Sequence, residues 1–304
     1  MSDGDREVQT AAAAPDPTSL ERVFAELRPR LHRYCARMTG SVIDGEDVLQ
    51  ETLAKALEAA VDGTRVANVE GWLFRIAHNA ALDFLRRRAR RESVHSAEDP
   101  EMVVDPRDPA AERVAAAAAM HSFMRLPAAR RGTVILRDVL GYTLEEIAGI
   151  LEMSVAAVKA ALHRGRAQLR KAASEPDDRP LPRLQATERA QLLAYVDRFN
   201  ARDFDAIRDM LADEVRLDLV SRTRMRGKPE VSHYLHRYSQ VHDWRLQVGL
   251  VDGRPAIVAS DFDDAEGRPT YFILLEWETG KVATIRDFRH ARYAVEGAEI
   301  SRLE

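Results

Sequence analysis

The chain has 304 residues, of which 45% are apolar and 31% are charged, and its formal net charge at pH 7 is −4. This length and composition favour two or three small globular domains over one large core. No apolar run approaches the roughly 20 residues that cross a bilayer, and the N-terminus lacks the basic-then-apolar order of a signal peptide. We therefore expect a cytoplasmic protein, in which the lone Cys35 is a buried small residue rather than a reactive thiol.

Composition and proline positions divide the chain into segments. Residues 1–17 are Ala-rich and polar, which predicts a disordered N-terminus. Helical periodicity predicts a first helical domain over residues 18–91 and a second over residues 110–173. The acidic, proline-bearing residues 92–109 are predicted to be a linker, and so are the proline-bearing residues 174–186. Residues 187–304 form the third domain.

In the first helical domain, the stretch Asp44–Leu57 is amphipathic. We expect one face to be buried, made of Val48, Leu49, Thr52, Leu53, Ala56 and Leu57. The opposite face carries Asp44, Asp47, Gln50, Glu51 and Lys55. This acidic face is either the solvated side of a bundle helix or a docking surface for another protein.

The next stretch, Gly71–Arg88, alternates aromatic and apolar residues with polar ones. Its polar positions include Arg75, His78, Asn79 and Asp83, and it ends in a block of arginines, Arg86, Arg87, Arg88, Arg90 and Arg91. Aromatic and amide side chains beside a cationic helix end suit unstacked single-stranded bases. We assign Trp72 and Phe84 to the core rather than to such a surface.

The second helical domain carries a helix-turn-helix pattern over Thr143–Lys171. Thr143 and Glu146 form a capping box that opens a helix at Leu144, and Ser154 caps the following helix. Glu152 stands in the turn, where glycine would be easier. Val158 and Leu162 face inward, and short or basic side chains are candidates for the groove-facing side. A plain helical hairpin is the alternative.

The third domain changes from helical to alternating patterns. A helical segment from Thr187 precedes five predicted strands, Val215–Val220, Trp244–Val251, Pro255–Ser260, Thr270–Trp277 and Val282–Phe288. Asp252-Gly253 and Thr279-Gly280 are predicted hairpin turns. The fold class is therefore multidomain, with two all-α domains followed by an α+β domain.

The first two domains resemble regions two and four of bacterial extracytoplasmic-function sigma factors. The resemblance rests on Asp44–Leu57, Gly71–Arg88 and Leu126–Lys171, in that order. It implies binding to core RNA polymerase, with the first helix on the β′ clamp and the second domain on the β flap. It also implies promoter DNA as a partner, with the first domain at the melted minus-ten element and the second at the minus-thirty-five element.

The resemblance assigns roles to particular residues. The polymerase contact falls on Asp44, Asp47, Gln50 and Glu51. The minus-ten contact falls on Arg75, Asn79, Asp83, Arg86, Arg87 and Arg88. The minus-thirty-five contact falls on Ser154, Ala156, Ala157, Lys159, Ala160, His163, Arg164 and Arg166.

Residues 187–304 resemble SnoaL-like domains of the nuclear-transport-factor-two superfold, a cone-shaped α+β fold. The resemblance implies a fused regulator whose cone can hold a small ligand. The polar candidates for such a pocket are Asp218, His242, Asp243, Arg286, Asp287 and His290, with Tyr195, Trp244, Tyr271 and Trp277 as lining. No acid-base pair stands at a telling spacing, so we expect neither an enzyme nor a cofactor. His233 and His236 permit a metal, but without a third ligand we expect none.

Two rival functions remain open from the sequence. One is a helix-turn-helix regulator that works without polymerase, which leaves the arginine and aromatic segment without a role. The other is a SnoaL-like enzyme fused to a DNA-binding module, which lacks evident catalytic residues.

Overall fold

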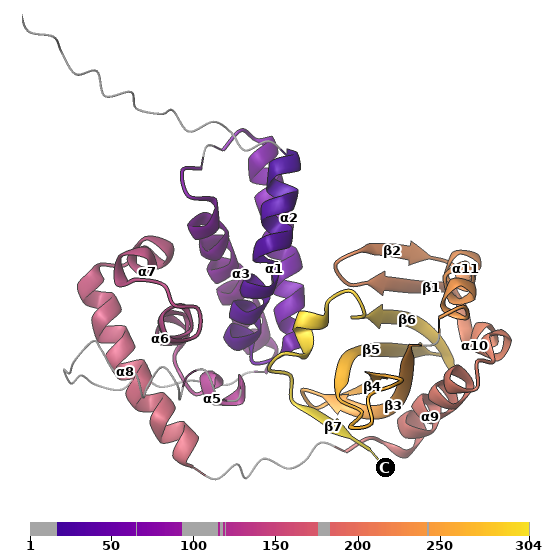
Figure 1. Cartoon of the computed structure of the whole chain (residues 1–304). Coiled ribbons are helices and arrows are strands. Elements are labelled where there is room, and N and C mark those ends of the chain that lie inside the picture. Colours follow the sequence, from indigo (N-terminus) through magenta and orange to yellow (C-terminus); the bar gives the residue numbers. More distant parts are fainter. Residues whose placement is uncertain are drawn as a thin grey trace, which may run out of the picture. The chain divides into compact units, whose positions relative to one another are not determined.

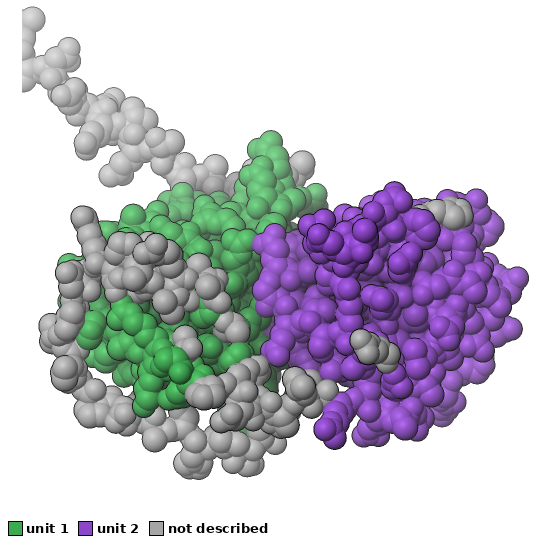
Figure 2. All heavy atoms as spheres, turned by 60° about the horizontal axis from the view of Figure 1, so that its bottom comes forward, with its two compact units in different colours: residues 1–40, 44–175 green, residues 41–43, 176–304 purple. Residues whose placement is uncertain are grey.

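The protein is described from a computed structural model that covers residues 17–64, 66–92, 115, 118, 120–175, 183–241 and 243–303. Two compact units are present, one formed by residues 1–40 and 44–175 and the other by residues 41–43 and 176–304 (Figure 2). The predicted N-terminal segment 1–17 and the acidic linker 92–109 lie almost entirely outside the described residues. Within the described part of the chain, no helix is long and apolar enough to cross a membrane.

In its described residues, the first unit contains helices and no strand (Figure 1). Its elements are α1 (Pro17–Thr39), α2 (Val42–Val61), α3 (Val69–Glu92), α5 (Met120–Met124), α6 (Ala128–Val134), the π-helix η1 (Ile135–Val139), α7 (Leu144–Leu151) and α8 (Val155–Ser174). The segments α1 to α3 and α5 to α8, expected as separate domains, share one apolar core. The Phe74 ring of α3 packs edge-on against Tyr34 of α1 and against Tyr142 before α7, at centroid distances of 5.7 and 5.2 Å.

The second unit places helices on one curved sheet (Figure 1). Its elements are α9 (Ala186–Asn200), α10 (Phe204–Met210), β1 (Leu211–Leu219), β2 (Thr223–Arg226), α11 (Lys228–Tyr238), β3 (Trp244–Val251), β4 (Arg254–Asp261), β5 (Pro269–Glu278), β6 (Lys281–Asp287), the 3-10 helix η2 (Arg292–Val295) and β7 (Ile300–Arg302). The sheet order is β2-β1-β6-β5-β4-β3-β7, and only β1 and β6 pair in parallel. Helical segments followed by a helix-covered sheet confirm the expected multidomain fold class, with α+β architecture in the last third.

Local sequence signals account for the hairpins of this sheet. Asp252 and Gly253 have φ of 49° and 76°, and Thr279 and Gly280 have φ of 49° and 79°. Two consecutive residues with positive φ are what a two-residue type I′ hairpin requires, so both predicted turns are confirmed. The five predicted strands are present, whereas β2 and β7 were not predicted.

The core of the second unit is aromatic where the helices meet the sheet. The Phe199 ring of α9 lies 5.1 Å from Phe204, 5.3 Å from Tyr238 and 4.8 Å from Trp244, measured between ring centroids. Such edge-to-face packing stabilises beyond area burial. These rings fill the space that the cone would otherwise enclose.

Candidate functional site

The acidic face of α2 is less solvated than its periodicity predicts. Asp47 is exposed and Gln50 and Glu51 are half-buried, but Asp44 is only 6% exposed. Next to Asp44, α2 comes close to α1: a Cβ on Gly45 would stand 2.5 Å from the backbone of Ala36. Leu57, expected on the buried face, is 42% exposed. The expectation was therefore wrong for Asp44, which was predicted on the exposed polar face, and for Leu57, which was predicted on the buried apolar face.

The arginine end of α3 lies beside the acidic face of α2. Arg87 donates from Nη2 to Glu51 Oε2 at 2.9 Å, and Arg88 Nη1 stands 3.8 Å from Asp44 Oδ2. Burial alone would raise the pKa of Glu51, but hydrogen bonds from Arg87 and Lys55 outweigh it and lower that pKa. We call Asp44, Glu51, Arg87 and Arg88 the α2–α3 charge cluster. It joins the residues predicted to bind polymerase to those predicted to bind the minus-ten element.

Further along α3, the polar residues fall into two groups. Asn79 is exposed, and Asp83 accepts a hydrogen bond from Arg86 at 2.9 Å. His78 is buried instead, with Nδ1 2.7 Å from the Tyr34 hydroxyl. Burial lowers the pKa of His78 to about 4, so the ring is neutral at pH 7. It therefore serves the core rather than a nucleic-acid surface.

The helix-turn-helix follows the predicted capping. The Thr143 hydroxyl accepts from the backbone N–H of Glu146, whose carboxylate accepts from the backbone of Thr143, which confirms the capping box. Ser154 accepts from the backbone N–H of Ala157 at 3.1 Å and caps α8. Glu152 adopts the left-handed conformation with φ of 55°, which confirms the strained turn.

Most residues predicted to read the minus-thirty-five element lie on the accessible side of α8. Ser154, Ala156 and Lys159 are exposed. Ala157, Ala160, His163 and Arg164 are half-buried. Short side chains near the start of such a helix let its backbone approach base edges, and the basic residues beyond them reach phosphates.

Arg166 is placed differently from the prediction. Its side chain is 4% exposed and donates from Nε and Nη2 to the Asp138 carboxylate, at 2.9 and 2.5 Å. Asp138 in η1 has a fully buried side chain. A bidentate pair between two buried charges fixes α8 against η1. In this conformation Arg166 therefore lies in the core and not on the DNA-facing side.

Residues that the sequence did not single out join α1 and α3 to the helix-turn-helix. Glu70 accepts from Arg30 at 2.5 Å and from the hydroxyl of Tyr142. Arg75, predicted as a minus-ten contact, pairs instead with Glu152 at 2.8 Å. These contacts link positions that are 40, 72 and 77 residues apart, so no local pattern could reveal them.

In the second unit, the pocket candidates divide between two places. Asp287 is buried under the helices, where it accepts from the Tyr234 hydroxyl at 3.3 Å and the Arg289 backbone N–H at 2.8 Å, and burial raises its pKa to about 6. The Tyr238 and Tyr271 hydroxyls lie 2.5 Å apart beside it.

The cavity beside Asp287 holds only about 10 Å³. That is about the size of one water molecule and leaves no room for a ligand in this state.

The other candidates lie elsewhere. Asp218 and Arg286 face away from the helices and approach each other to 3.8 Å. His242 lies outside the described residues. His233 and His236 are exposed on α11, and across the described residues no three His, Cys, Asp or Glu side chains are grouped to hold a metal ion.

The first unit combines a helix-turn-helix, whose second helix α8 is capped and partly basic, with the arginine-rich end of α3. These are features of a DNA-binding protein. Two stretches of the chain match models of known protein families. Residues 23–91 match Sigma-70 region 2, and residues 118–169 match Sigma-70, region 4.

Two similar proteins agree with these family matches. The chain is 30% identical over 262 residues to the ECF RNA polymerase sigma factor SigG of Mycobacterium tuberculosis, covering 75% of this chain and 70% of that one. It is 32% identical over 165 residues to the ECF sigma factor SigM of the same organism, covering 54% and 82%. The chain belongs to the ECF family of RNA polymerase sigma factors.

Among solved structures, the chain is similar to the extracytoplasmic-function sigma factor SigJ of Mycobacterium tuberculosis, at 23% identity. That similarity covers 88% of this chain and 95% of that one, with a TM-score of 0.35. A putative polyketide cyclase of Pseudomonas putida is similar to 35% of this chain at 22% identity, over 94% of its own length, with a TM-score of 0.27.

Proposed function

We propose that this chain binds core RNA polymerase in the cytoplasm and directs it to promoters. The observation that carries the proposal is the first unit itself. A capped recognition helix whose first turns expose Ser154, Ala156 and Lys159 stands in one unit with the arginine-rich end of α3. A regulator acting without polymerase would need the first surface but has no use for the second.

The polymerase contact is proposed for the exposed part of the α2 face. Asp47, Gln50 and Glu51 would meet the β′ clamp, whereas Asp44 is too buried to do so and instead positions Arg88. Because Glu51 already pairs with Arg87, polymerase binding would free that arginine for DNA. The helices α6 to α8 are proposed to meet the β flap.

The minus-ten contact is proposed for Asn79, exposed in the middle of α3, and for Arg86 and Arg87, exposed near its C-terminal end. An amide reads base edges, and guanidinium groups bind phosphate and stack on bases. Asp83 would position Arg86 through their hydrogen bond at 2.9 Å.

Promoter binding would require the first unit to open. Arg75 of α3 and Glu152 before α8 are joined by an ion pair at 2.8 Å. Their proposed DNA elements are about 25 base pairs apart, which is roughly 85 Å at ~3.4 Å per base pair. The 27 residues between Glu92 and Met120 can span at most about 97 Å when fully extended, so one chain can reach both elements once the shared core separates.

The second unit is proposed as a regulator of this opening rather than an enzyme or a ligand carrier in its present state. Its interior is filled by its own aromatic rings, and Asp287 has no space beside it for a substrate. Deleting residues 187–304 should change promoter-dependent transcription several-fold. Equal transcription by the truncated and full-length chains, at matched concentration, would remove this regulatory role.

Permanganate footprinting of a promoter with core polymerase tests the minus-ten assignment. The chain should make thymines near minus ten reactive, and Arg86→Gln with Arg87→Gln should reduce that reactivity. Arg22→Gln, exposed on α1 outside the cluster, is the control. Normal promoter melting with the double variant would refute the proposed single-strand contact of Arg86 and Arg87.

A further inference from the structure

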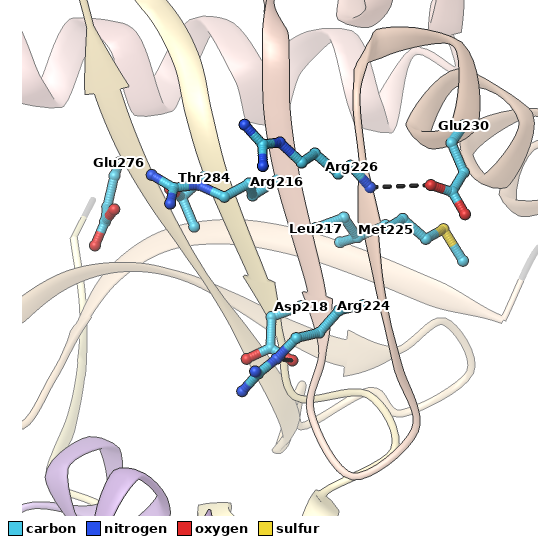
Figure 3. A pocket seen from close by; sticks show the side chains of 9 residues that line it. All are labelled: Arg216, Leu217, Asp218, Arg224, Met225, Arg226, Glu230, Glu276 and Thr284. Carbon is cyan, nitrogen blue, oxygen red and sulfur yellow. Dashed lines mark hydrogen bonds and ion pairs between the residues drawn. The ribbon is translucent and has the colours of Figure 1, made fainter.

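A hollow of about 590 Å³ over β1 and β2 is balanced in charge. Its charged lining, among the described residues, is three arginines and three carboxylates, namely Arg216, Arg224, Arg226, Asp218, Glu230 and Glu276 (Figure 3). Strand register places Arg216 opposite Arg226 and Arg224 opposite Asp218, which stand 3.6 Å apart in the second pair. This hollow therefore favours neither an anion nor a cation.

A second hollow, of about 580 Å³, lies where the end of α9, the start of β3 and the residue after β4 meet, and we call it the β3 hollow. Two arginines, two aromatic rings and two amides line it, and no carboxylate of the described residues does. Its lining is Asn200, Arg202, Trp244, Arg245, Leu246, Gln247 and Phe262. It shares no lining residue with the cavity beside Asp287, so it lies apart from the filled interior of the unit.

Arg245 brings an uncompensated charge to the β3 hollow. Within the described part of the chain, no carboxylate stands within ion-pair distance of it. Its guanidinium instead lies 5.5 Å from the centroid of the Phe262 ring, which is 56% exposed. The neighbouring Asp243 is held by Arg289 at 2.8 Å, and Asp261, the cross-strand partner of Trp244, is not part of the lining. The hollow thus presents a cation and an accessible aromatic ring side by side.

Arg202 brings the second cation, and the backbone holds it in place. Its Nη2 donates to the carbonyl oxygens of Ser239 and Val241, at 2.7 and 2.5 Å, and the guanidinium lies 5.1 Å from the Trp244 ring centroid. Its Nε and Nη1 donate to no acceptor among the residues that the structure describes. Arg202 also has a φ of 62°, a left-handed conformation that glycine adopts more easily. A fixed guanidinium with N–H groups to spare is preorganised for an anion.

The strand edge inside the β3 hollow is closed to a peptide. Asn200 donates from Nδ2 to the Leu246 carbonyl at 2.9 Å and accepts from the Leu246 N–H at 3.1 Å. These bonds occupy the backbone groups through which an added strand would pair with β3. The volume, by contrast, is in the range of small-molecule sites.

We propose that the β3 hollow binds a small aromatic carboxylate. The ring packs against Phe262, and the carboxylate accepts hydrogen bonds from Arg245 and Arg202. Guanidinium groups suit this ligand, because their planar fork matches a carboxylate and their faces stack on rings. The inference concerns the second unit by itself and does not depend on polymerase binding.

Isothermal titration calorimetry of the full chain with two matched probes tests the inference. The probes 2-naphthoate and 2-naphthamide have the same ring and nearly the same size, but only the first is an anion. The natural chain should bind 2-naphthoate at one site, at least ten-fold more tightly than 2-naphthamide, because hydrogen bonds to a charged group are stronger. Added salt should weaken the binding of 2-naphthoate only.

Variants assign the site. Arg245→Gln should lower the affinity for 2-naphthoate about ten-fold and leave 2-naphthamide unchanged. Phe262→Ser should weaken both probes, because both use the ring. The control, Arg216→Gln with Arg226→Gln, removes two arginines from the charge-balanced hollow and should change neither affinity. Arg245 and Phe262 are exposed, so their variants should melt at the temperature of the natural chain.

Several outcomes would overturn the proposal. Equal affinity of the natural chain for the two probes, or no binding of 2-naphthoate, would do so without any variant. Undiminished 2-naphthoate binding by Arg245→Gln, or an equal loss in the control, would show that the anion binds elsewhere. A single-stranded oligonucleotide that displaces 2-naphthoate and binds more tightly would make nucleic acid, and not a small ligand, the occupant.

Discussion

The buried pair of Arg166 and Asp138 gives the sharpest test of how the helix-turn-helix is built. Replacing Asp138 with Asn keeps the shape but leaves a guanidinium buried without its counter-charge. Both side chains are at most 4% exposed, so solvent screens the pair little. Removing one partner of such a pair costs about 3–5 kcal/mol, and the retained amide oxygen favours the lower end. At ~2–4 °C per kcal/mol for a unit of this size, the melting midpoint should fall by roughly 10 °C.

The assay is urea and thermal unfolding of the full chain followed by helical circular dichroism. A second variant, Asp138→Leu with Arg166→Met, removes both charges and should recover most of the lost stability, because an apolar pair of similar volume is close to neutral. With its fold restored, this variant should bind a minus-thirty-five duplex within holoenzyme about as tightly as the natural chain.

Two results would refute this reasoning. A loss below about 1 kcal/mol for Asp138→Asn would mean that the pair is not buried as described. A stable double variant that loses promoter affinity ten-fold would mean that Arg166 contacts DNA after all.

Other predictions follow from the first unit. Charge reversal at Asp47 and Glu51 should weaken pull-down of core polymerase without unfolding the chain, and undiminished capture would remove the α2 contact. Thr143→Ala should cost about 1 kcal/mol in urea unfolding through loss of the capping box, whereas no cost would contradict it. Because burial lowers the pKa of His78 to about 4 from 6.5, its unfolded form binds more protons between these values. Stability should fall by about 3 kcal/mol as pH drops from 6.5 to 4, and His78→Gln should flatten that part of the profile; an equal slope in the variant would refute it.

Sequence reasoning succeeded where one short segment carries the whole signal. The Thr143 capping box and the Asp252-Gly253 turn depend on neighbouring residues only, and both are confirmed. Arg166 shows a signal that was present and overlooked. It follows Val158 and Leu162 by four-residue steps and precedes Leu169 by three, which places it on the buried stripe of α8.

The rest depends on contacts between distant parts of the chain. Periodicity marks one face of α2 as apolar but does not reveal how closely Gly45 lets α1 approach, and so it missed the burial of Asp44. The strand β2 has only Met225 half-buried between charged residues, too short an alternation to predict. Without β2 and its register, the opposition of Arg216 and Arg226 could not be foreseen.

Run-off transcription by core polymerase tests the central claim most directly, with a library of promoter fragments and with or without this chain. Transcripts should begin at defined sites only when the chain is present, and Asp47 and Glu51 charge reversal should abolish them. Specific duplex binding by the chain alone, with no start site gained by polymerase, would contradict the account and favour a regulator that works without polymerase.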